Sequence, residues 1–142
     1  MSLYSIDNFK YSTGVEDSIS QNAHYHMADC HLKKNNKAAA RNSFAAAFKP
    51  SFDDNIREDA MFNYAKLCYE LSYNPYNEAI EVFSNYIKYY PASPRIDEAY
   101  SYLVNVYLST KNYKDALASI ERVKNLTNDL KQAYQKIAYL RG

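Results

Sequence analysis

The chain has 142 residues, with seventeen Lys and Arg against sixteen Asp and Glu, and only two glycines and four prolines. Sites that cradle nucleotide phosphates need several glycines, because the backbone must approach the anion closely. This chain has only Gly14 and Gly142, which excludes the nucleotide-binding motifs. The charges are dispersed and leave no cationic stripe, which argues against nucleic acid as a partner because Lys and Arg supply most of that affinity.

No apolar run reaches the roughly 20 residues of a membrane span, and the N-terminus lacks the residue order of a signal peptide. We therefore expect no direct membrane insertion. Met1-Ser2-Leu3 has the form of a cloning remnant, and the last repeat described below stops after its first helix. The sequence thus predicts a piece of a longer protein, whose targeting signals and compartment it leaves open.

Two short patterns alternate along the chain. One opens at Ala23, Ala60, Ala99 and Ala133, at intervals of 37, 39 and 34 residues. The other has alanine and a large apolar residue four positions later, and its members are Ala40 and Phe44, Ala79 and Phe83, and Ala116 and Ile120. A period of this length with two elements predicts stacked helical hairpins in a single solenoid.

The apolar spacing and its interruptions predict seven or eight helices in chain order. Tyr4–Ser12 forms the first, ended by Thr13-Gly14. The others are expected over residues 20–34, 37–48, 57–72, 76–90, 95–109, 113–126 and 129–141.

Proline, serine and asparagine mark the predicted breaks. Pro50 and Pro91 stop the helices before them, and Ser93 is expected to cap the next helix with Pro94 in its first turn. Tight turns are expected at Asn35-Asn36 in the first repeat and at Lys111-Asn112 in the third. Asn74-Pro75 lengthens the corresponding turn of the second repeat by two residues.

The pattern resembles the tetratricopeptide repeat, in which a small residue of the first helix lets the second approach while a large residue fills the space beside it. The residues that hold the family's positions are His24, Met27, Ala28, His31, Ala40, Phe44 and Ala47; Met61, Tyr64, Ala65, Cys68, Tyr76, Ala79, Phe83 and Pro91; and Tyr100, Leu103, Val104, Tyr107, Tyr113, Ala116, Ile120 and Val123.

The resemblance covers nearly the whole chain and implies an all-α, right-handed α-solenoid of antiparallel helical hairpins. Its parts would be a half repeat and linker over 4–19, repeats over 20–56, 57–94 and 95–128, and the first helix of a fourth repeat over 129–142. The usual glycine is Ala28, Ala65 or Val104 here, and Ile120 replaces phenylalanine. These exchanges are compatible with the fold.

The segment from Ala79 to Tyr100, with six residues between Phe83 and Tyr90-Pro91 and with Asp97-Glu98-Ala99-Tyr100, is similar to repeats of bacterial cell-envelope proteins. Those are outer-membrane assembly lipoproteins and the Tol–Pal periplasmic coordinator. The resemblance implies a scaffold that holds protein partners, in a parent protein of the periplasm or outer membrane.

Three histidines and a cysteine, His24, His26, Cys30 and His31, lie within eight residues. Their directions around a helix diverge, whereas a zinc site needs converging ligands, so we expect neither a metal nor a cofactor. We expect His24, His31 and both cysteines, Cys30 and Cys68, to be packing residues. The carboxylate pairs Asp53-Asp54 and Asp97-Glu98 precede helices and are expected to meet their positive ends.

The first helices of such repeats line a concave groove, where aromatic rings beside amides and lysines suit an extended peptide. Projecting the pattern predicts these groove residues: Tyr25, His26, Asp29, Lys33, Phe62, Asn63, Lys66, Tyr69, Tyr102, Asn105, Leu108, Gln135 and Tyr139. Tyr25 and Asp29 stand where the family's chaperone-tail clamp has other residues, which disfavours that partner.

The leading hypothesis is a non-enzymatic scaffold that binds a protein or peptide. A structural spacer between other domains is the first alternative, RNA binding is the second, and an enzyme is the weakest because no catalytic constellation converges. Leu130, Ala133, Tyr134, Ile137 and Leu140 form an apolar stripe on the last helix. We therefore also expect weak self-association through the truncated ends.

Overall fold

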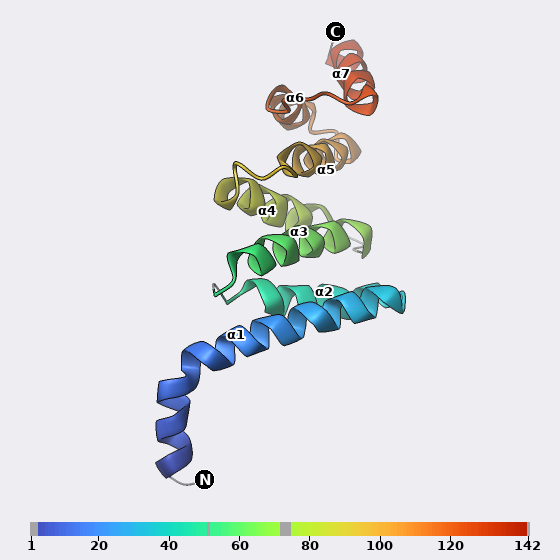
Figure 1. Cartoon of the computed structure of the whole chain (residues 1–142). Helices are drawn as coiled ribbons and strands as arrows, with labels where there is room; N and C mark the ends of the chain where they lie inside the picture. The colour runs from blue at the N-terminus through green and yellow to red at the C-terminus, as the bar shows by residue number, and fades with distance from the viewer. Residues whose placement is uncertain (1–2, 51, 72–74, 142) are drawn as a thin grey trace. The chain divides into compact units, whose positions relative to one another are not determined.

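The computed structural model describes residues 3–50, 52–71 and 75–141 (Figure 1). Seven helices and no strand lie within these ranges: α1 (Leu3–Lys33), α2 (Lys37–Phe48), α3 (Asp54–Leu71), α4 (Pro75–Tyr89), α5 (Ile96–Ser109), α6 (Tyr113–Glu121) and α7 (Asn128–Arg141). The prediction of an all-α chain is confirmed. In the described part of the chain, no helix is both long enough and apolar enough to cross a membrane.

The predicted turns at asparagine are confirmed. Asn35 and Lys111 both adopt a φ of 59°, the left-handed conformation that closes a helix. The next residue in each case caps the following helix: the side-chain oxygen of Asn36 accepts the Ala39 N–H, and that of Asn112 accepts the Asp115 N–H. The lengthening at Asn74-Pro75 lies partly outside the described residues.

The predicted end of the first helix at Thr13-Gly14 is wrong. α1 runs without interruption from Leu3 to Lys33 and so includes the expected half repeat and linker. One glycine inside a helix costs only about 1 kcal/mol relative to alanine. That cost is too small to break a helix that continues on both sides.

Ser93 does not cap α5, contrary to the prediction. The N-cap residue is Arg95, which makes no side-chain capping bond. The Ser93 hydroxyl instead accepts the Arg95 N–H at 3.1 Å and shares a 2.7 Å hydrogen bond with the buried Tyr86 hydroxyl. The serine therefore fixes the loop after α4, because its hydroxyl binds both the buried Tyr86 hydroxyl and the Arg95 backbone.

α6 ends at Glu121, five residues before its predicted end. The reason lies in α5: the two carboxylate oxygens of Asp97 accept the backbone N–H groups of Lys124 and Asn125, each at 3.1 Å. Those two N–H groups would donate to carbonyls of the same helix if α6 continued.

A second side chain holds a loop in the same way. The amide of Gln21, fully buried on α1, donates to the carbonyls of Pro50 and Asp53 at 3.0 and 3.2 Å and accepts the Asp53 N–H at 2.9 Å. Gln21 stands two residues before Ala23, as Asp97 stands two before Ala99. One repeat position thus anchors the loop that follows the second helix of its own pair.

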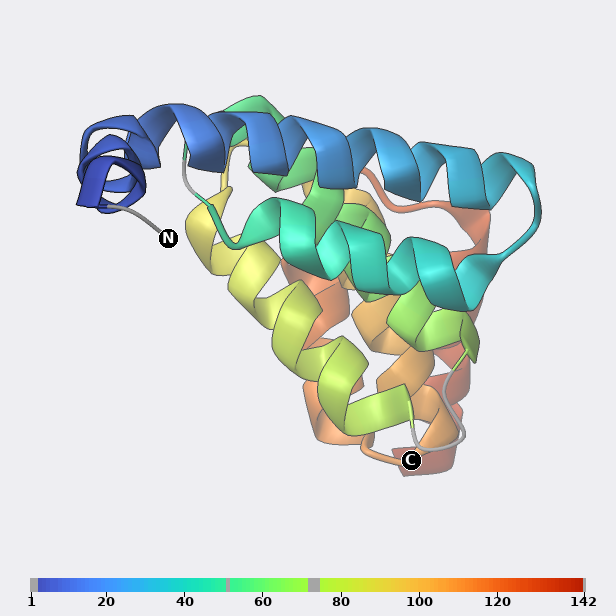
Figure 2. The ribbon, with the colours of Figure 1, turned by 90° about the horizontal axis from the view of Figure 1, so that it is seen from below.

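The chain divides into two compact units, residues 1–67 and 68–142. In the first unit, α1 and α2 pack along each other (Figure 2). Ala28 and Ala40 are fully buried where these helices meet, and their small side chains let the two backbones approach. The ring of Phe48 on α2 lies 5.3 Å from that of Tyr64 on α3.

In the second unit, α4 packs on α5, α5 on α6 and α6 on α7. Phe83 on α4 is fully buried. The core between α5, α6 and α7 consists of Val104, Ala116, Ile120, Val123, Leu130 and Ile137. Burial of these apolar side chains is the main favourable contribution to the packing.

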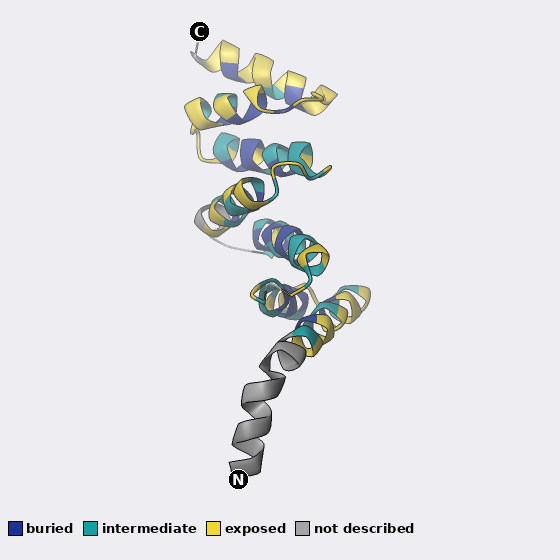
Figure 3. Cartoon of the chain, turned by 60° about the vertical axis from the view of Figure 1, so that its left-hand side comes forward, coloured by how far each residue is buried: buried dark blue, intermediate teal, exposed yellow. Residues whose placement is uncertain are grey.

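Two packing predictions for α1 are wrong. Cys30 is exposed, whereas Cys68 is buried as expected, and neither forms a disulfide. Met27, which holds a core position of the repeat pattern, is 48% exposed. The apolar stripe predicted on α7 is covered only in part: Leu130 and Ile137 are buried, while Tyr134 and Leu140 are exposed (Figure 3).

Candidate binding surfaces

A polar cluster in the first unit joins two of the predicted groove residues. The Tyr25 hydroxyl on α1 donates to a carboxylate oxygen of Asp59 on α3 at 2.5 Å. The Asn63 amide donates to the same oxygen at 3.1 Å and to the Asp59 backbone carbonyl at 2.8 Å. Sequence reasoning missed Asp59, although its place one helical turn before Asn63 puts both on one face of α3. We call these three residues the Tyr25 cluster.

Charged residues beside the cluster neutralise one another. Lys33 and Asp29, one turn apart on α1, form an exposed ion pair at 3.0 Å. The hydrogen bond to Asp29, and then its charge, raise the pKa of Lys33 above the ordinary lysine value. An exposed pair of this kind contributes little to stability. His26 is exposed and lies edge-on to the Tyr25 ring, while Lys66 on α3 is half-buried.

Two predicted groove tyrosines of the second unit are in contact. The ring of Tyr69 at the end of α3 meets that of Tyr102 on α5 edge-on, with centroids 5.2 Å apart and planes at 67°. Phe83 stacks on Tyr102 almost in parallel, at 5.0 Å and 9°. Tyr69 and Tyr102 are both half-buried. Each aromatic contact contributes beyond the buried area, so Tyr102 is held in place from two sides.

The hydroxyl of Tyr102 stays protonated over the physiological range. Partial burial raises its pKa above the ordinary tyrosine value, and the carboxylates of Glu98 and Glu70 raise it further. A protonated phenol can both donate and accept a hydrogen bond. Tyr102 therefore offers a ligand a supported ring and a polar handle.

The other predicted groove residues of this unit differ in how well they are supported. Asn105, one turn beyond Tyr102 on α5, is exposed, and Leu108 is half-buried. Gln135 and Tyr139 lie one turn apart on α7, and the Tyr139 ring is 85% exposed. Within the described residues, neither makes a side-chain hydrogen bond or ring contact with Tyr69, Phe83 or Tyr102. We call Tyr69, Tyr102 and Asn105 the Tyr102 surface, which the buried Phe83 supports from below.

Phe62, the phenylalanine predicted to line the groove, is only 3% exposed. It is therefore placed as a packing residue. The helical projection put Phe62 beside Asn63 on the open face, but a phenyl ring gains more free energy from burial than from exposure to water.

The histidine-rich segment does not converge on a metal site. His24 and His31 are half-buried, whereas His26 and Cys30 are exposed. Among the described residues, no group of three or more metal-binding side chains comes together.

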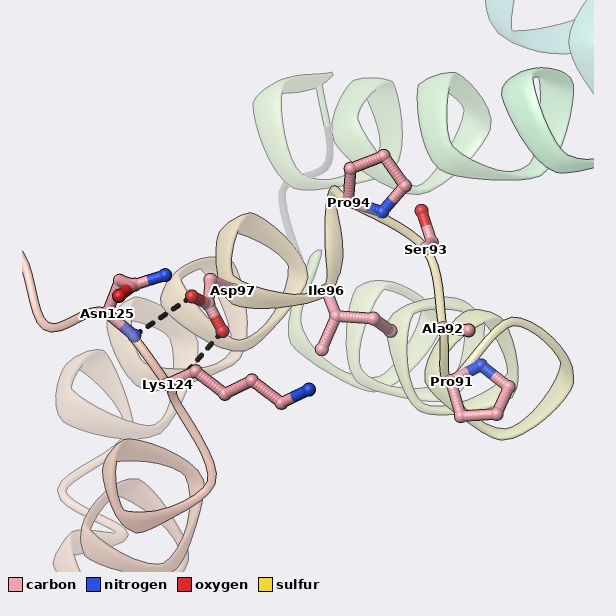
Figure 4. Close-up of a pocket in the computed structure, with 8 residues that line it drawn as sticks. All are labelled: Pro91, Ala92, Ser93, Pro94, Ile96, Asp97, Lys124 and Asn125. Atoms are coloured by element: carbon pink, nitrogen blue, oxygen red, sulfur yellow. Dashed lines mark hydrogen bonds between the residues drawn. The ribbon is translucent and has the colours of Figure 1, made fainter.

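A small cavity of about 260 Å³ lies between the loop after α4 and the segment after α6 (Figure 4). Pro91, Pro94 and Ile96 form much of its apolar wall, and the Asp97 carboxylate binds the segment on the other side. Both oxygens of that carboxylate are occupied by backbone N–H groups. The cavity is accordingly a junction between loops, with no uncommitted acid or base in its wall other than Lys124.

No protein family, curated protein or solved structure was found to match the chain. The Tyr25 cluster and the Tyr102 surface contain aromatic rings and amides, and the charges of Asp29 and Lys33 beside the Tyr25 cluster neutralise each other.

Proposed function

We propose that this protein is a non-enzymatic scaffold that binds an extended peptide segment of a protein partner. The observation that carries the proposal is the half-buried Tyr102 ring, stacked on Phe83 and braced by Tyr69, with the exposed amide of Asn105 one turn away. A ring already held in position loses little conformational freedom when a ligand docks on it. Asn105 can form hydrogen bonds with the backbone of that ligand.

We further propose that the helices form a right-handed α-solenoid of antiparallel hairpins of the tetratricopeptide type. Burial of the repeat positions supports this arrangement. The three members of each set are almost fully buried: Ala28, Ala65 and Val104; Ala40, Ala79 and Ala116; and Phe44, Phe83 and Ile120. Such periodic burial is what stacked two-helix repeats require.

The similarity of the segment from Ala79 to Tyr100 to envelope repeats supports a place in a bacterial envelope protein. Two observations on this segment give its residues structural roles. Tyr86 and Ser93 bond to each other, and Asp97 holds the loop after α6. The motif therefore stabilises two loops of this fold. The envelope assignment is a proposal about the parent protein.

The test is a selection of random 12-residue peptides displayed on phage against the chain. We expect enriched peptides that are retained by the wild type and lost by Tyr102→Ala and Asn105→Ala. The control is Tyr89→Ala, which truncates an exposed tyrosine on α4. Enrichment that survives both Tyr102→Ala and Asn105→Ala would place binding elsewhere. No enrichment at all would favour the alternative function of a structural spacer between other domains.

A further inference from the structure

One face of α1 carries an exposed apolar stripe that the Tyr25 cluster does not use. Ile19, Ala23, Met27 and Cys30 follow one another at intervals of four, four and three residues and are all exposed. Such spacing places them along one side of the helix, over about 17 Å of its axis. We call these four residues the α1 stripe.

The equivalents of Met27 in the other repeats, and two equivalents of Ala23, are covered. Met27 corresponds to Tyr64, Leu103 and Ile137 at the repeat intervals of 37, 39 and 34. Leu103 and Ile137 are buried, and Tyr64 lies against Phe48 of α2. Ala23 corresponds to Ala60 and Ala99, both fully buried. In this set of repeats, α1 is the helix whose Met27 position is left open.

In the second unit, the counterparts of Ala23, Met27 and Cys30 on α5 are Ala99, Leu103 and Val106, which are buried but do not belong to the core between α5, α6 and α7. α4 precedes α5 in the chain and packs on it, and the Phe83 ring of α4 lies on Tyr102 of α5. α4 carries Ala79, Phe83 and Tyr86, all fully buried, over about two turns of an amphipathic helix. The α1 stripe is therefore the counterpart of an interface that a helix of this kind already makes once in the molecule.

Charge selects the same kind of helix. Two helices that are joined by a short connection and pack along each other run in opposite directions. A helix laid on the stripe as α4 lies on α5 would bring its N-terminal half beside Lys34, which is exposed at the end of α1. α4 carries exposed Glu78 and Glu81 in that half. Opposite charges at these places fix the orientation of the incoming helix.

We propose that the α1 stripe is a docking site for an amphipathic helix of a protein partner. The partner helix has an alanine, a large aromatic residue four positions later, and acidic residues in its N-terminal half. The site lies on the side of α1 away from the buried Ala28 and Gln21.

The probe is a synthetic peptide with the sequence of residues 75–90, which contains the α4 pattern. It is bridged between the positions of Ser84 and Lys88, both exposed in α4, so that it is helical before binding. Cys30 belongs to the stripe and Cys68 is buried, so the rate of thiol modification by a soluble disulfide reagent reports cover on the stripe. We expect saturating peptide to slow Cys30 modification at least fivefold.

Matched variants give the proposal its specificity. Met27→Glu on the stripe should reduce the affinity at least tenfold, whereas Asn22→Glu, an exposed position on another side of α1, should leave it within twofold. A peptide with lysine in place of Glu78 and Glu81 should bind at least threefold more weakly. Circular dichroism of each variant confirms that the helices are intact.

Three outcomes would overturn the proposal. The first is unchanged Cys30 modification at millimolar concentrations of the bridged peptide. The second is an equal loss of affinity in Met27→Glu and Asn22→Glu. The third is protection of Cys30 that rises with protein concentration when no peptide is present, which would assign the stripe to a second copy of this chain.

Discussion

At the scale of single residues, aromatic side chains divide into those that hold the fold and those that a ligand can reach. Phe83 is fully buried, and Tyr102, which it supports, is half-buried. Phe83 thus stabilises the core, whereas a ligand can contact the Tyr102 ring. The two roles can be separated experimentally because each ring can be changed alone.

Replacing Phe83 with alanine should lower the free energy of unfolding by about 3–5 kcal/mol, because the change removes a buried ring and leaves a cavity. Phe52→Ala is the control, since Phe52 is 54% exposed. That change should stay within about 0.5 kcal/mol. Urea denaturation measures both. Similar small losses in the two variants would show that Phe83 is not a core residue.

The raised pKa of Tyr102 predicts a pH dependence at alkaline pH. The unfolded state releases this proton near the ordinary pKa of about 10, before the folded state does, so the stabilisation is fully present below pH 10 and declines above it. The difference in unfolding free energy between the wild type and Tyr102→Phe should therefore be constant from pH 7 to 9 and should fall above pH 10. A difference that grows above pH 10 would contradict the assigned direction.

At the scale of the helices, polar side chains from one helix set the ends of others. Gln21 holds the loop between α2 and α3, and Asp97 holds the segment between α6 and α7. The loop residues that Gln21 and Asp97 bind lie more than 25 residues from them along the chain. Helix boundaries here are consequently a property of the packed pairs as well as of local propensity.

Gln21→Leu should cost about 2–4 kcal/mol, because it leaves a buried N–H and two carbonyls of the loop without their partner. Asn22→Leu, at the exposed neighbouring position, serves as the control and should be nearly neutral. The hydrogen-exchange rate of the Asp53 amide measures directly whether its hydrogen bond to Gln21 has been lost. An Asp53 amide that exchanges equally slowly in Gln21→Leu would show that Gln21 does not hold the loop.

Asp97→Ala should lengthen α6. Without the carboxylate, the N–H groups of Lys124 and Asn125 become available to carbonyls of α6, and helical 13Cα shifts should extend beyond Glu121, with a stability loss of about 1 kcal/mol. Glu98→Ala removes the neighbouring carboxylate of the same first turn and should leave the end of α6 unchanged. Unaltered shifts at residues 122–125 in Asp97→Ala would refute this cause.

The helices themselves were largely predictable from sequence, because proline and asparagine stop helices through local chemistry. α2 matches its predicted range, and α4, α5 and α7 agree within one residue at each end. The break at Gly14 failed because a single glycine weakens a helix without ending it. The early end of α6 could not be predicted, since it depends on Asp97 in a different helix.

At the scale of the whole molecule, repeat spacing predicted which positions are buried wherever one helix packs on another. It did not predict exposure of Met27 and Cys30, because repeat spacing assumes that every helix has a neighbour on both sides. For the surfaces, Tyr25, Asn63, Tyr69 and Tyr102 were predictable from the helical projection. The roles of Asp59 and the burial of Phe62 depend on contacts that the projection does not contain.

The most direct measurement of the binding claim is the dissociation constant of a phage-selected peptide for matched tyrosine variants, by fluorescence anisotropy. Tyr102→Ala should weaken binding about 30-fold, equivalent to roughly 2 kcal/mol for an aromatic anchor. Tyr89→Ala should stay within twofold of the wild type. Equal affinities for the wild type and Tyr102→Ala, in variants with the same helical content, would contradict the assignment of the Tyr102 surface as the peptide site.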